Sequence, residues 1–87
     1  MKMIELKTIN PYFTDVWNGD KPFEIRKDDR DYILGDILWL REYATTTGYS
    51  GRSIIAEVSY IIPAGVFKGL VEGYCAMTID ILQRKTE

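Results

Sequence analysis

Three apolar segments rich in branched and aromatic side chains occupy the second half of the chain, and they constrain the fold more than any other feature. They cover residues 37–43, 52–62 and 74–82, and no segment of helical periodicity separates them. Antiparallel strands need only a turn between them, whereas parallel neighbours need a long crossover. We therefore expect a largely antiparallel sheet, with 37–43 as its central strand and residues 44–51 as the loop of a long hairpin.

The first third of the chain predicts two more strands and one helix. Residues 4–9 alternate apolar and charged side chains, which predicts a half-buried strand, and residues 21–27 predict another. Between these strands, residues 11–18 predict a short helix. Asn10 before it is a good N-cap, and Gly19 after it is a residue often found just past a helix end. The apolar stripe of this short helix should pack on the sheet, and it consists of Phe13, Val16 and Trp17.

These elements predict one mainly β domain over residues 1–87, with one or two short helices (α+β). Strands as apolar as these need closure or a second layer to hide both faces, so we expect a small antiparallel β-barrel with the helix covering one side. With 46% hydrophobic residues there is enough material for one core. We assign Trp17, Trp39 and Cys75 to that core.

The composition excludes several kinds of site. The chain has no histidine and a single cysteine, which rules out imidazole catalysis, the usual zinc sites and an intrachain disulfide. We expect no metal and no cofactor. The charged start and the lack of a long apolar run predict a cytoplasmic protein without a signal peptide or membrane contact. Because the net charge is −2, binding of nucleic acid would require a local patch or pocket.

The strongest candidate site lies in residues 19–36, on the predicted strand 21–27. Alternation puts Glu24 and Arg26 on one face of this strand, and Lys21 precedes them beside Pro22. An ammonium group, a carboxylate and a guanidinium together can hold a base and its phosphate. The alternative is a solvated salt-bridge ladder, which contributes little to stability.

Two neighbouring segments supply further candidates. In the bend after the strand, Lys27 and Arg30 could add positive charge beside Arg26, although such a bend is usually a solvated turn. At the hairpin loop, Tyr49 and Arg52 could stack on and clamp a single-stranded base together with Tyr43. Alternatively, the tyrosines pack over the end of the barrel with their hydroxyl groups in water.

Gly19, Lys21, Glu24 and Arg26 match a G-x-K-x-x-E-x-R pattern, and in this respect the chain resembles the ASCH domains of the PUA-like superfamily. The resemblance extends along nearly the whole chain to a small family of bacterial and phage domains within that group. It implies a PUA-like barrel, a cleft lined by Lys21, Glu24 and Arg26, and RNA binding, with Arg52 as a second wall. Related enzymes use a threonine where Glu24 stands, so the resemblance does not carry their hydrolase activity over directly.

Three functional hypotheses follow. The first is an RNA-binding module that holds a base or nucleotide in the Lys21/Glu24/Arg26 cleft, with the segment 49–52 closing over it. The second is a small amidohydrolase or other hydrolase of a modified nucleoside or nucleotide, in which Lys21 polarises the substrate and Glu24 acts as general base. The third is a protein-interaction surface on the apolar hairpin. We expect a monomer or a weak homodimer.

Overall fold

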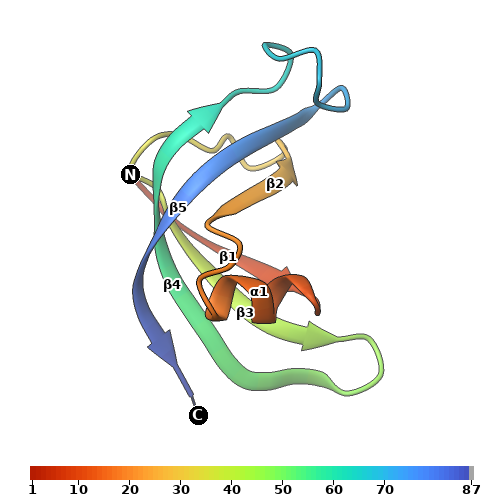
Figure 1. Cartoon of the computed structure of the whole chain (residues 1–87), viewed down its shortest axis with the longest axis vertical. Helices are drawn as coiled ribbons and strands as arrows, with labels where there is room; N and C mark the ends of the chain where they lie inside the picture. The colour runs from red at the N-terminus through yellow and green to blue at the C-terminus, as the bar shows by residue number, and fades with distance from the viewer. Residues whose placement is uncertain (87) are drawn as a thin grey trace.

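The computed structural model describes residues 1–86, which form five strands and one short helix (Figure 1). The prediction of a mainly β chain with a short helix is confirmed. In chain order the elements are β1 (Met3–Thr8), α1 (Tyr12–Trp17), β2 (Phe23–Lys27), β3 (Ile37–Ala44), β4 (Gly48–Ile62) and β5 (Tyr74–Lys85). Within the described residues, no helix is long and apolar enough to cross a membrane.

The strands form one mixed sheet in the order β1-β3-β4-β5-β2, and the sheet curls into a half-barrel (Figure 1). Three of the four pairings are antiparallel, but β1 and β3 run parallel. The segment between β1 and β3 contains both α1 and β2, so it is long enough for the crossover that a parallel pair requires. The expected largely antiparallel sheet is confirmed, and it forms a half-barrel with β1 and β2 as its two edges.

The structure corrects two predictions about β3 and one about the hairpin. The central strand is β4, and β3 lies between β1 and β4. Leu38 and Leu40 are buried on β3, but Trp39 faces the opposite side of the sheet and lies outside the core, because neighbouring side chains of a strand alternate faces. The hairpin loop is residues 45–47 and not 44–51, because the strand pairing continues to Ala44 and Gly48.

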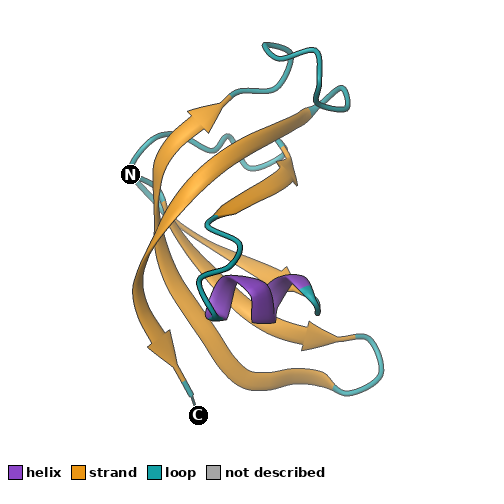
Figure 2. Ribbon diagram, in the orientation of Figure 1, coloured by secondary structure: helices purple, strands orange, loops and turns teal. Residues whose placement is uncertain are grey.

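The core fills the concave side of the half-barrel, where α1 lies (Figure 2). The predicted helix stripe packs as expected: Phe13 and Val16 are buried, and Trp17 packs against the core from its edge. Cys75 is fully buried in the same core, as predicted. The N-cap of the helix is Pro11 and not Asn10 as predicted, but the side-chain oxygen of Asn10 accepts a hydrogen bond from the backbone N–H of Thr14 at 3.0 Å.

A salt bridge on the β3–β4 hairpin holds the helix against the sheet. Arg52 donates from Nε and Nη2 to the two carboxylate oxygens of Glu42, both at 2.9 Å. Its guanidinium carbon lies 5.3 Å from the ring centroid of Phe13 and 4.9 Å from that of Trp17. Asn10, just before the helix, also donates to Glu42, at 2.6 Å. This planar, bidentate pair therefore joins β3 and β4 to α1.

A second buried carboxylate anchors the start of the chain. Asp36 is fully buried and accepts hydrogen bonds from the backbone N–H of Lys2 at 3.0 Å, from the Lys2 ammonium at 2.9 Å and from the backbone N–H of Ile33 at 2.9 Å. Burial opposes ionisation of Asp36, but these hydrogen bonds outweigh it and lower its pKa. The ionised side chain thus connects the beginning of β1 to the turn before β3.

The Asp36 contacts predict a large loss of stability on substitution. In Asp36→Asn, an amide group replaces one of the two acceptor oxygens, so at least one donor of Lys2 or Ile33 loses its acceptor on this buried side chain. We expect the free energy of unfolding to fall by about 2 kcal/mol, measured by urea denaturation. Asp80→Asn is the matched control, because Asp80 is exposed on β5. Equal stabilities of the two variants would contradict the assignment.

The Glu42–Arg52 salt bridge predicts a pH-dependent stability. Hydrogen bonds from Arg52 lower the pKa of Glu42 from 4.5 to about 2. Because the carboxyl group binds protons less readily in the folded state, its stabilisation is complete above about pH 4.5 and disappears as the pH falls through about 2. We expect Glu42→Gln to lose about 3 kcal/mol at pH 7, and this difference from the wild type to shrink steadily towards pH 2.

Urea denaturation at several pH values measures this difference. Glu72→Gln is the matched control, because it removes the same charge from an exposed position. A Glu42→Gln deficit that stays constant with pH would show that ionisation of Glu42 does not stabilise the fold.

Candidate functional site

Strand β2 presents Glu24 and Arg26 to the interior of the half-barrel and its apolar side chains to solvent. Glu24 is 2% exposed, whereas Phe23 and Ile25 are 41% and 50% exposed. The predicted alternation is present, but the charged face of the strand points inward and the apolar face points to solvent. In a strand that only covers a core, these two faces would be exchanged. The interpretation of Glu24 and Arg26 as a solvated ladder therefore does not describe this strand.

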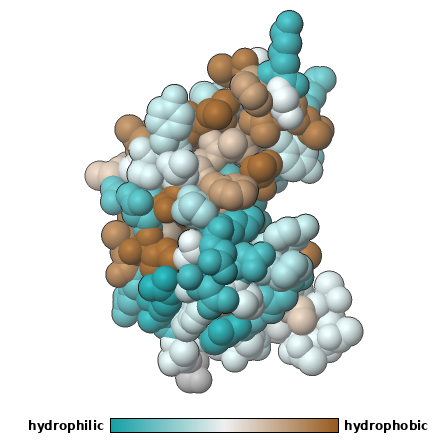
Figure 3. All heavy atoms as spheres, in the orientation of Figure 1, coloured by the Kyte–Doolittle hydropathy of each residue, from teal (hydrophilic) through white to brown (hydrophobic). Residues whose placement is uncertain are grey.

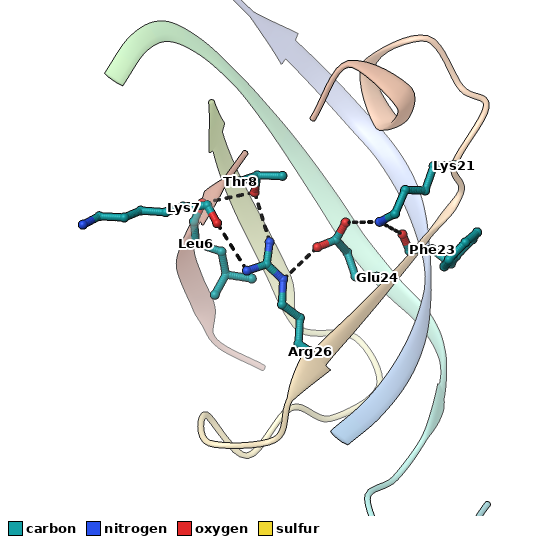
Figure 4. Close-up of polar contacts among 7 residues, drawn as sticks. All are labelled: Leu6, Lys7, Thr8, Lys21, Phe23, Glu24 and Arg26. Atoms are coloured by element: carbon teal, nitrogen blue, oxygen red, sulfur yellow. Dashed lines mark hydrogen bonds and ion pairs between the residues drawn. The ribbon is translucent and has the colours of Figure 1, made fainter. Parts of the chain in front are cut away.

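Glu24 holds a cation on each of its carboxylate oxygens (Figure 4). Lys21 donates from Nζ to Oε2 at 2.8 Å, and Arg26 donates from Nε to Oε1 at 2.8 Å. Lys21 also donates to the backbone carbonyl of Phe23 at 2.8 Å. The structure thus brings the three predicted residues together as one ion cluster, with one positive charge in excess.

Arg26 reaches across the open side of the half-barrel, from edge strand β2 to edge strand β1 (Figure 4). Its Nη1 donates to the backbone carbonyl of Lys7 at 3.3 Å, and its Nη2 donates to the hydroxyl group of Thr8 at 3.1 Å. The gap between the two edge strands, which we call the seam, is therefore bridged here by a side chain.

The end of helix α1 sets the position of Lys21. Gly19 adopts a left-handed conformation with φ of +83°, and its N–H donates to the carbonyl of Val16 at 3.0 Å. The backbone N–H groups of Asp20 and Lys21 both donate to the carbonyl of Asp15, at 2.9 and 3.0 Å. This is a Schellman ending extended by one residue. It turns the chain from the helix directly into the site.

A cavity of about 770 Å³ opens beside the ion cluster, and we call it the first cavity. Its size is within the range of small-molecule sites. Two exposed aromatic rings lie near the Lys21 ammonium, with centroid distances of 5.8 Å for Tyr12 and 4.9 Å for Phe23. The lining residues are Lys7, Thr8, Ile9, Tyr12, Asp15, Asp20, Lys21, Phe23, Glu24, Ile25 and Arg26.

A second cavity of about 660 Å³ adjoins the first and shares Lys7 and Arg26 with it. Three other predicted residues line this second cavity, namely Lys27, Arg30 and Tyr49. The structure therefore distributes the predicted positive charges over two adjoining cavities along the seam.

Arg52 lines neither of these two cavities, because its guanidinium is bound to Glu42 beside the helix. Tyr49 and Tyr43 pack edge to face, with 5.0 Å between their ring centroids. The guanidinium carbon of Arg41 lies 3.7 Å from the centroid of the Tyr49 ring. The segment 49–52 thus contributes Tyr49 and not Arg52 to the surface near the seam.

Sequence reasoning missed Thr8 and Tyr12, and each left a signal. Thr8 follows Ile4 and Leu6 at the strand period, so a polar side chain stands at an inward-facing position, and it is 3% exposed. Tyr12 begins the helix beside the apolar stripe without belonging to it, and it is 52% exposed. An aromatic ring placed in this way is available for a ligand.

The side chains near the seam do not supply a nucleophilic thiol or a metal site. Burial raises the pKa of Cys75, and the nearby charge of Asp28 raises it further, so the thiol is the form present at neutral pH. Within residues 1–86, no three histidine, cysteine, aspartate or glutamate side chains lie together in a way that would hold a metal ion.

Figure 3 places this charged region in the whole molecule. Hydrophilic residues gather over the helix and the chain that follows it, and hydrophobic residues gather at the top of the view, around the connection between β4 and β5. Exposed apolar side chains of that connection are Val66, Phe67 and Val71. Hydrophilic residues are thus concentrated on this face at the helix side of the half-barrel.

Comparison with known proteins places the sequence in a family. No curated protein matches the chain. A family model described as "Domain of unknown function (DUF3850)" matches residues 3–79, a range that includes the whole ion cluster and both edge strands. Because this match covers well over half of the 87 residues, the chain belongs to the DUF3850 family.

Proposed function

We propose that the protein is an RNA-binding module that holds one base and its phosphate in the first cavity. The observation that carries this proposal is the buried carboxylate of Glu24, which holds Lys21 and Arg26 in place beside two exposed aromatic rings. A buried ion cluster is no more stabilising than well-packed apolar side chains of similar size. Its presence at an inward-facing position therefore favours a role in recognition.

The cations keep donors for a ligand. An ammonium group has three N–H donors and a guanidinium has five. Contacts within residues 1–86 use two donors of Lys21 and three of Arg26. The remaining donors and the excess positive charge suit the oxygens of one phosphate group.

The rest of the cavity suits a base. Tyr12 and Phe23 offer exposed ring faces for stacking, which is the usual way in which proteins hold an unpaired base. Asp15 and Asp20 line the same cavity, and carboxylate oxygens accept hydrogen bonds from the amino groups of bases. The cavity therefore combines phosphate, stacking and base-edge contacts.

The wider family assignment is part of the same proposal. The half-barrel with a short helix on its concave side, together with the G-x-K-x-x-E-x-R pattern of residues 19–26, supports the assignment of this chain to the ASCH domains of the PUA-like superfamily. The RNA-binding role inferred for that group agrees with the contents of the first cavity.

The geometry favours binding over hydrolysis. Both carboxylate oxygens of Glu24 already accept charge-assisted hydrogen bonds from cations. Each oxygen therefore already faces a cation of the protein, which favours a positioning role for Glu24 over proton abstraction from a substrate. In this proposal Glu24 positions Lys21 and Arg26.

The proposal predicts a loss of RNA binding in Lys21→Ala. Loss of one charge-assisted contact should weaken the binding of a nucleotide or short single-stranded RNA by about tenfold or more. Ligand-detected NMR against nucleosides, nucleotides and short RNAs measures this, and the affinity of the wild type should fall with added salt. Lys85→Ala, which removes a charge from the exposed end of β5, should bind like the wild type. Unchanged binding in Lys21→Ala, or no binding by the wild type, would overturn the proposal.

The fate of the ligand separates the binding module from the hydrolase. We expect a bound nucleotide or acetylated nucleoside to be recovered intact after many hours with the wild-type protein, as judged by mass spectrometry. Release of a group by the wild type but not by Glu24→Gln would instead support the hydrolase hypothesis.

A further inference from the structure

The second cavity concentrates positive charge in a protein that is acidic as a whole. Four cationic residues and two carboxylates line this cavity, whereas the complete chain has a net charge of −2. The cations are Lys7, Arg26, Lys27 and Arg30, and the carboxylates are Glu5 and Asp29. An excess of cations at one place on an acidic protein indicates an anionic ligand.

The two carboxylates do little to cancel this charge. Glu5 is paired with Arg41 at 2.7 Å, so its charge is already balanced from outside the cavity. Asp29 lies 3.9 Å from Arg30, and both side chains are at least half exposed, which makes that pair weak. The ammonium group of Lys27 has no salt-bridge partner among the contacts of residues 1–86. Lys27 and Arg30 are therefore available to a ligand.

The two cavities lie next to each other along the seam, and Arg26 forms part of the wall of both. Its guanidinium is fixed between Glu24 and the β1 edge. A ligand that occupied both cavities would therefore pass Arg26 where the cavities meet. Figure 4 shows the side chain of Lys7 pointing away from Glu24, on the far side of Arg26. A chain of phosphates that begins beside Lys21 would therefore meet further cations in this direction.

We infer that the two cavities bind adjacent nucleotides of one single-stranded RNA, with the second phosphate beside Lys27 and Arg30. This inference rests on the proposed function and narrows its ligand from a free nucleotide to an oligonucleotide of at least two residues. The ring of Tyr49 is 41% exposed at this cavity and is backed by the guanidinium of Arg41, which is a suitable platform for the second base.

The size of the ligand tests this inference directly. Isothermal titration of the wild type compares a ribonucleoside 5′-monophosphate with a 5′-phosphorylated diribonucleotide that begins with the same nucleotide. We expect the dinucleotide to bind about tenfold more tightly, as one added charge-assisted contact would provide. The double variant Lys27→Ala/Arg30→Ala should lose this gain and still bind the mononucleotide like the wild type.

Controls separate the local site from general charge and from the proposed function. Lys68→Ala/Lys85→Ala removes two exposed cations outside both cavities and should keep the gain. Equal affinity of the wild type for both ligands would overturn this inference and leave the proposed function standing. Loss of the gain in the control variant, or weaker mononucleotide binding in Lys27→Ala/Arg30→Ala, would also overturn it. If neither ligand binds the wild type, the proposed function and this inference both fail.

Discussion

The carboxylate of Glu24 is the contact on which the arrangement of the site depends. It is buried on an edge strand and holds Lys21, which arrives from the end of the helix, and Arg26, which continues to the opposite edge strand. Through Glu24 and Arg26, the chain that follows the helix and edge strand β2 are thus connected to edge strand β1. Without this contact the two cations would repel each other in a poorly solvated place, so the position of each depends on the other two.

Two further carboxylates show the same use of buried charge elsewhere in the fold. Asp36 ties the start of β1 to the turn before β3, and Glu42 ties the β3–β4 hairpin to the helix through Arg52. A domain of this size buries a modest core, and each of these contacts fixes a segment that apolar packing alone would leave loosely placed. Lys21 and Arg26, the cations on Glu24, also line the first cavity.

Local patterns predicted the elements of the site but not their surroundings. Strand alternation placed Glu24 and Arg26 on one face, and Gly19 marked the helix end that delivers Lys21, because both depend only on neighbouring residues. The inward orientation of that face, the parallel pairing of β1 with β3 and the bridge from Arg26 to Thr8 depend on contacts between distant segments. The salt bridge between Arg52 and Glu42 also joins two different strands. Local patterns therefore did not reveal it, and Arg52 was predicted as part of the cleft.

The seam between β1 and β2 has a consequence for how the chain meets other chains. Strand edges with unpaired backbone groups are places where two proteins can join into one continuous sheet, and short edge strands with inward-pointing charges resist such joining. Both edges here are short, and Arg26 occupies the space between them. The side chain of Arg26 in the ion cluster therefore also lies where a pairing strand from a second molecule would have to enter.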